Sequence, residues 1–153
     1  MCRQHALVLC LRNLIPESKT AKALIDSGSS ITIVSELFTR IHKLPIKPVG
    51  ESETLGLISA NTGLVHVVGT TDFLIRVSGL TMPVTARVAK TLSHRFILGV
   101  DFLETYGAKI DYQLGVISLS DDMIQAPLHI PFKQDLLVTC LDSVCIPSYT
   151  EKF

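Results

Sequence analysis

Hydrophobic residues in this chain fall mostly into short runs, separated by Gly, Pro, Asn, Ser or Asp. Runs that alternate with polar residues, or that are wholly apolar between turn residues, are typical of β-strands. The predicted strands are 6–14, 21–26, 31–34, 54–58, 64–69, 73–77, 82–88, 96–98, 108–112 and 116–119. Many short strands at regular spacing predict an all-β barrel or sandwich.

Two short helices are expected to interrupt the strands. Ser35 is placed as the N-cap of a helix over 36–43, and Asp101 with Glu104 three residues later resembles a capping box that starts a second helix. Gly107 is expected to end this second helix. The apolar residues at helical spacing in the first helix, which we expect in the core, are Leu37, Phe38 and Ile41.

Length and composition fit one domain with an appended segment. The chain has 153 residues, of which 47% are hydrophobic and 18% charged, which favours a packed core over disorder. Three of the seven prolines lie in 121–153. We therefore expect a folded domain over 1–120 and a C-terminal extension or linker over 121–153, with one strand near 136–141.

The formal net charge of zero argues against nucleic-acid or membrane-surface binding driven by bulk charge. No apolar run approaches the roughly 18 residues that a membrane span needs, and the run over 6–11 is too short for a signal peptide. The four cysteines and five histidines lack the spacing of a disulfide framework or a metal site. We expect a cytoplasmic protein without a metal or organic cofactor.

The candidate chemistry lies at Asp26, directly between an apolar run and Gly28. Asp is depleted in strands and costly to bury without partners, so a carboxylate here suggests a function. On the Asp-Ser-Gly triplet alone, a structural turn carboxylate is the more frequent explanation. One carboxylate does little to an amide bond, but two that share a proton can act as a base and an acid.

A second segment changes this interpretation. Together with 24–28, the run Phe96-Ile97-Leu98-Gly99 and its continuation to Tyr112 resemble the retropepsin-like aspartic proteases, especially those of Ty3/gypsy-type long-terminal-repeat retrotransposons. The resemblance covers about residues 5–120 and implies a closed β-barrel that forms a homodimer. Because the chain has one Asp-Ser-Gly, each subunit would supply one Asp26 at a twofold axis. The extension over 121–153 would then lead toward a reverse transcriptase.

The resemblance also implies a role for each site residue. Asp26 would activate the water, Ser27 would hydrogen-bond across the dimer axis, and Gly28 would let the substrate backbone approach. The residues expected to bind substrate, including a hairpin tip over 60–63 that would form the flap, are Ser29, Ser30, Ile33, Ile58, Ala60, Asn61, Thr62, Gly63 and Ile97. The substrate would be an extended, mainly apolar peptide, most plausibly a junction in the protein's own polyprotein.

The sequence departs from the family at two positions. Many viral members carry an acidic residue two positions after the catalytic Gly and an Arg directly after the later Gly, and these form an ion pair. Ser30 and Val100 stand there in this chain. The charged brace is therefore expected to be absent, which leaves dimer stability and substrate anchoring open.

Two alternatives remain at this point. The same fold could serve as a catalytically silent dimerisation or peptide-binding module, because fold does not prove activity. It could also belong to a cellular retropepsin-like protease of the kind found in ubiquitin-shuttle proteins. A serine-nucleophile mechanism is not supported, because Ser27, Ser29 and Ser30 have no GxSxG context.

Overall fold

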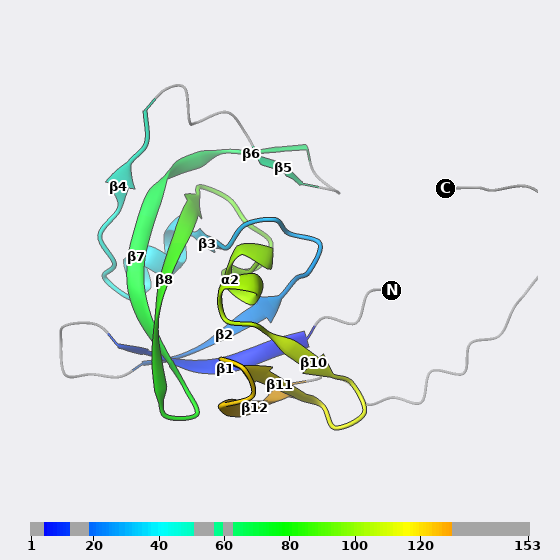
Figure 1. Cartoon of the computed structure of the whole chain (residues 1–153). Coiled ribbons are helices and arrows are strands. Elements are labelled where there is room, and N and C mark those ends of the chain that lie inside the picture. Colours follow the sequence, from blue (N-terminus) through cyan, green and yellow to red (C-terminus); the bar gives the residue numbers. More distant parts are fainter. Residues whose placement is uncertain (1–4, 13–18, 51–56, 60–62, 130–153) are drawn as a thin grey trace, which may run out of the picture.

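The computed structural model describes residues 5–12, 19–50, 57–59 and 63–129 (Figure 1). The order of elements in these ranges is β1 (His5–Arg12), β2 (Lys19–Ile25), β3 (Ile33–Ser35), α1 (Glu36–Ile41), β4 (Lys47–Pro48), β5 (Leu57–Ser59), β6 (Gly63–Val65), β7 (Val67–Val77), β8 (Leu80–Ala89), β9 (Phe96–Leu98), α2 (Val100–Thr105), β10 (Lys109–Asp111), β11 (Val116–Leu119) and β12 (Ile124–His129). The predicted all-β fold with two short helices is confirmed.

The strand pairings close on themselves. The main sheet runs β10-β11-β12-β1-β2-β9-β3-β8-β7-β4, and β1 additionally pairs with β7. The strands β1, β2, β9, β3, β8 and β7 therefore form a ring, which is the closed barrel that the resemblance implied. Two of its pairings, β2–β9 and β3–β8, are parallel, whereas the others in the ring are antiparallel.

The barrel core follows from alternation along the long strands. Every second side chain of β7 is buried from Val67 to Val77, and β8 alternates in the same way over Met82–Val88, because successive side chains of a strand point to opposite faces. Inside, the rings of Phe38, Phe73 and Phe96 pack with centroids 5.1–6.1 Å apart. This aromatic cluster packs α1 against β7 and β9 of the barrel.

The first helix begins as predicted, and its burial differs from the prediction. The Ser35 hydroxyl accepts a hydrogen bond from the Phe38 N–H at 3.1 Å, so Ser35 is the N-cap. Phe38 is 2% exposed, but Leu37 and Ile41 are 47% and 39% exposed. The prediction that all three are core residues is wrong for these two, because a six-residue helix buries only one face and Leu37 and Ile41 share another.

The second helix begins two residues earlier than predicted. Gly99 is its N-cap and Val100 its first residue, so the prediction of Asp101 as the N-cap is wrong. Asp101 lies in the first helical turn. Its carboxylate accepts hydrogen bonds from the N–H and hydroxyl of Thr32, which directly precedes β3, and from the Phe102 N–H. The helix still ends before Gly107, which adopts a φ of 52°.

The sheet continues past Ser120. β12 pairs with β11 and also with β1, where Leu7 is opposite Leu128. Residues 124–129 were assigned from sequence to the extension. They contribute buried Ala126 and Leu128 to the core. The predicted strand near 136–141 lies outside the described residues, and the route toward a reverse transcriptase stays a prediction.

The hairpin β5–β6 forms a separate two-stranded sheet at the opposite end of the molecule from β10–β12 (Figure 1). Ser59 is opposite Gly63, so the predicted hairpin exists, while its tip at 60–62 lies outside the described residues. β4 leads into this region and pairs with β7 through Lys47 opposite Thr70. Within the described ranges no helix is long and apolar enough to cross a membrane.

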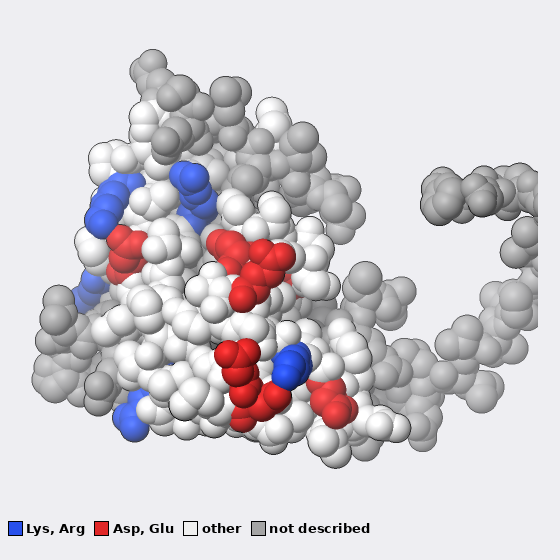
Figure 2. Space-filling view, viewed as in Figure 1, with Lys and Arg blue, Asp and Glu red and all other residues white. Residues whose placement is uncertain are grey.

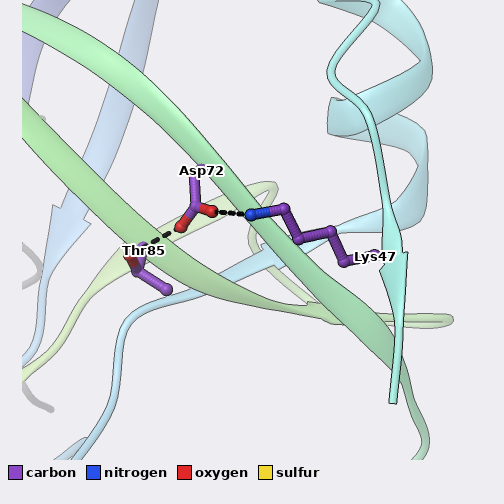
Figure 3. Close-up of polar contacts among 3 residues, drawn as sticks. All are labelled: Lys47, Asp72 and Thr85. Atoms are coloured by element: carbon purple, nitrogen blue, oxygen red, sulfur yellow. Dashed lines mark hydrogen bonds and ion pairs between the residues drawn. The ribbon is translucent and has the colours of Figure 1, made fainter.

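A polar network fastens β4 to the barrel (Figure 3). The Lys47 ammonium lies 2.6 Å from Asp72 Oδ2, and the Thr85 hydroxyl donates to Asp72 Oδ1 at 2.7 Å. These bonds, that from Lys47 first, hold the pKa of the Asp72 carboxyl below its ordinary value. All three side chains are exposed, so the ion pair adds little to stability and serves mainly to orient β4.

We expect Asp72→Asn to lower the free energy of unfolding by less than about 1 kcal/mol at pH 7. Because the pKa is lowered in the folded state, the contribution is present above the ordinary value near 3.8 and is lost as pH falls through the lowered pKa. Urea unfolding of both proteins at pH 7 and at progressively lower pH measures this. A difference that stays constant from neutral to strongly acidic pH would contradict it.

Candidate functional site

The site begins where β2 ends. Asp26 follows Ile25, the last residue of β2, and its N–H donates to the carbonyl of Leu98 at 3.0 Å. The chain then turns, because the Ser29 N–H donates to the Asp26 carbonyl at 3.1 Å. In this turn the Gly28 N–H donates to Asp26 Oδ1 at 2.9 Å. The half-buried carboxylate is thus oriented by its own loop.

The loop is crossed closely by the backbone at the end of β9. A Cβ placed on Gly99 would lie 2.3 Å from the Ile31 carbonyl oxygen and 2.8 Å from that of Ser29. No side chain fits this space. At the crossing, the Val100 N–H donates to the Ser29 carbonyl at 2.8 Å and the Asp101 N–H to that of Ser30 at 3.3 Å. Two segments about seventy residues apart are therefore joined backbone to backbone.

Thr32 and Asp101 form a second connection across the same crossing. Thr32 is 1% exposed, and its N–H and hydroxyl donate to the Asp101 carboxylate at 2.9 and 2.7 Å. The Thr32 hydroxyl oxygen also accepts from the Gly99 N–H at 3.1 Å, and Asp101 Oδ1 accepts from the Phe102 N–H. The buried Thr32 hydroxyl therefore both donates and accepts a hydrogen bond. These bonds fix the loop relative to α2.

This connection bears on the expectation that the charged brace between positions 30 and 100 is absent. Neither residue supplies a charge, but both supply backbone groups to the crossing, as the carbonyl of Ser30 and the N–H of Val100. No ion pair forms between these two positions, and the segments are joined instead by main-chain bonds and by the Asp101 carboxylate, one residue further on. Sequence reasoning missed Thr32, although a polar residue inside Ile31-Thr32-Ile33-Val34 was a signal, because buried polar groups need partners.

The structure brings several predicted site residues together around Asp26. Ser27, Gly28 and Ser30 are exposed in the loop, while the half-buried Ser29 donates its hydroxyl to the Ile31 carbonyl at 2.7 Å. Ile33 and Ile97 are directly opposite each other on β3 and β9, and they are 7% and 8% exposed. These two side chains consequently form one apolar pair on the barrel beside the loop.

The remaining predicted residues belong to the hairpin. Ile58 lies in β5 opposite Leu64, and Gly63 is the first residue of β6. Ala60, Asn61 and Thr62 lie outside the described residues. In Figure 1 the loop after β2 and the β5–β6 hairpin both extend toward the right-hand side of the view. The roles of these residues in substrate binding stay a prediction.

Charge around the site is unevenly distributed. Figure 2 shows acidic side chains gathered over α2 and again over the turns of β10–β12. The helix carries Asp101 and Glu104, β10 ends at Asp111, and the turn before β12 carries Asp121 and Asp122. Among the described residues, no group of three or more His, Cys, Asp or Glu side chains is arranged to hold a metal ion.

Comparison with known proteins gives a consistent family. Residues 22–126 match the family model described as the PEG10/RTL1 protease domain. This range includes the Asp26 loop, the Gly99 crossing and both helices. A search of curated protein sequences gives no match.

Solved structures show the same fold. The retroviral protease-like domain of Ddi1 from Leishmania major is similar with a TM-score of 0.60 and 15% identity, covering 84% of this chain and 92% of that one. The EIAV protease in complex with the inhibitor HBY-793 has a TM-score of 0.52 and 20% identity, covering 69% and 90%. At these identities the likeness establishes the retropepsin-like fold.

We expect Gly99→Ala to destabilise the protein by several kcal/mol or to prevent folding, because its Cβ would overlap the Ile31 carbonyl. Circular dichroism and urea unfolding measure the loss. Gly115→Asn is the control, since Gly115 has a φ of 66° that Asn tolerates and no atom within 4 Å of its added Cβ. Equal stability of the two variants would show that the crossing does not require glycine.

We expect Thr32→Val to lower the free energy of unfolding by about 1–3 kcal/mol, because the Gly99 N–H and the Asp101 carboxylate each lose a partner. Thr32→Ser keeps the hydroxyl and loses one methyl group, so it should cost less. Urea unfolding of the three proteins decides between them. If Ser is as destabilising as Val, packing rather than the hydrogen bonds holds the crossing.

Proposed function

Because the chain belongs to the family of PEG10/RTL1 protease domains, we propose that it is an aspartic endopeptidase that works as a homodimer. The observation that carries this proposal is the loop Asp26-Ser27-Gly28. Its half-buried carboxylate is oriented by the Gly28 N–H, and the loop is held in place by the crossing at Gly99. A turn carboxylate with only a structural role would not need a second segment to hold its loop.

Peptide hydrolysis by the aspartic-protease mechanism needs two carboxyl groups, and one chain supplies a single Asp-Ser-Gly. In a twofold dimer the two Asp26 side chains would meet at the axis. Like charges at hydrogen-bond distance cannot both ionise, so one carboxyl group would hold a proton while the other remains charged. The charged one would take a proton from the attacking water, and the protonated one would donate to the substrate carbonyl.

The surrounding loop suits this arrangement. Ser27 and Gly28 are exposed beside Asp26, so the Ser27 hydroxyl is available to bond across the axis and the Gly28 carbonyl to accept from substrate. We propose that the substrate is an extended peptide bound as an added strand, with main-chain bonds for affinity and side-chain pockets for selectivity. The β5–β6 hairpin would close over it, and a junction of the protein's own polyprotein is the expected target.

The competing proposal is a silent module that dimerises or captures peptides without cleaving them. It is favoured by the neutral residues Ser30 and Val100, which remove the ion pair common in viral members. The hydrogen bonds from Thr32 to Asp101 counter it, because they brace the loop by another route. A cellular retropepsin-like protease would share the chemistry and differ in its substrate.

We expect the purified protein to cleave members of a mixed peptide library between pH 4 and 7, and Asp26→Asn to abolish cleavage without unfolding the barrel. Activity per subunit should fall steeply on dilution, because a monomer holds half of the site. Mass spectrometry of the products and sedimentation at the same concentrations measure both effects. A dimer that cleaves nothing would favour the silent module.

Mixing subunits provides a further control on assembly. Excess Asp26→Asn should reduce the activity of the parent protein by forming mixed dimers with one ionisable carboxyl group. Activity that is independent of added Asp26→Asn would contradict the shared site.

A further inference from the structure

A pocket of about 560 Å³ lies on the barrel between β2, the end of α1, the segment before β9 and the end of β12. We call it the basic pocket because its ionisable lining residues are Lys22, His42, His94, Arg95 and His129. Three of the five histidines of the chain are thus gathered in one concavity from three separate segments, and β2 adds Lys22. The Asp26 loop does not account for this gathering.

The sign of the charge is uniform. Among the described residues that line the pocket none is acidic, although the whole chain balances 14 basic against 14 acidic residues. Lys22 and Arg95 are exposed and carry permanent positive charge, whereas the histidines add charge only when protonated. A concave surface of one sign between low-dielectric walls concentrates oppositely charged groups. The ligand of such a pocket carries negative charge.

The floor of the pocket is rigid. It includes Phe38 and Phe96, whose rings pack at 5.1 Å in the barrel core, and the His42 ring lies 4.4 Å from that of Phe38. Beside them, Ser93 Oγ and His94 Nδ1 are 3.1 Å apart. Because this part of the lining packs in the core, the pocket is preformed, and a ligand can bind in it without first ordering the protein.

The position of the pocket connects it to the candidate active site. Its lining includes Leu24, two residues before Asp26, and Leu24 is opposite Ile97 of β9. Lys22 and Leu24 share one face of β2, while Ala23 and Ile25 of the other face are buried in the core. The lining of the basic pocket therefore runs along β2 from Thr20 to Leu24, two residues before Asp26.

We propose that the basic pocket binds acidic side chains of the peptide substrate at positions outside the pair flanking the scissile bond. This inference rests on the proposed function and adds a substrate class to it, namely apolar cleavage sites accompanied by Asp or Glu. A peptide fits the pocket better than a nucleic acid, because the basic groups converge in one concavity and form no extended stripe along which a phosphate backbone could run.

The test compares peptides that share one cleavable apolar sequence and differ only at flanking positions, with Glu in one and Gln in the other. The double variant Lys22→Gln/Arg95→Gln is set against Arg76→Gln/Lys90→Gln, which removes the same charge from exposed residues outside the pocket lining. We expect the parent and the control variant to show a KM about three- to tenfold lower for the Glu peptide, with similar kcat. The pocket variant should lose this preference.

Binding to Asp26→Asn separates this inference from the proposed function. Fluorescence anisotropy with labelled Glu and Gln peptides should show the same preference without cleavage, and added salt should weaken it. Preferential binding without cleavage by the parent would support the pocket and refute the protease. Cleavage with equal KM for both peptides, or a preference that survives in the pocket variant, would overturn the pocket. Displacement of the Glu peptide by equimolar inorganic phosphate would also overturn the assignment to acidic peptides.

Discussion

The contact on which this protein depends is the crossing of two backbones at Gly99 and Ile31. The space there is too small for a Cβ, so the crossing exists only because one residue lacks a side chain. From it follow the parallel pairing of β2 with β9, the start of α2 at Val100 and the shape of the loop that holds Asp26. The Asp26 loop is thus specified by a residue that is remote in sequence.

The hydrogen bonds around the crossing join mostly neutral backbone groups, where many viral members have an ion pair. Ser29 and Ser30 offer carbonyls, and the first turn of α2 offers N–H groups. Only Asp101 is ionisable, and it faces Thr32 rather than a cation. A loop held mainly by main-chain bonds does not need the acidic and arginine pair of many viral members. The substitutions at Ser30 and Val100 are therefore compatible with an ordered loop.

Sequence patterns predicted local features well and long-range ones poorly. The alternation along 67–77 and the Ser35 cap depend on neighbouring residues, so the sequence predicts them. The Asp26 loop is predicted by its Asp-Ser-Gly motif. The role of Asp101 depends on Thr32, sixty-nine positions away, and helical spacing could not show that Leu37 faces solvent. β12 was missed because Pro127 interrupts its apolar pattern, although its pairing with β1 and β11 tolerates proline at an exposed position.

The closing pair β1–β7 has a consequence for self-association through strand edges. A ring has no open edge, so within the described residues the outermost strands of the main sheet are β10 and β4. β4 has two residues and ends in Pro48, which offers no N–H, and β10 has three residues that include the charged Lys109. Short edges with proline or lysine discourage edge-to-edge polymerisation. These two ends of the main sheet accordingly give fibril growth little backbone to extend.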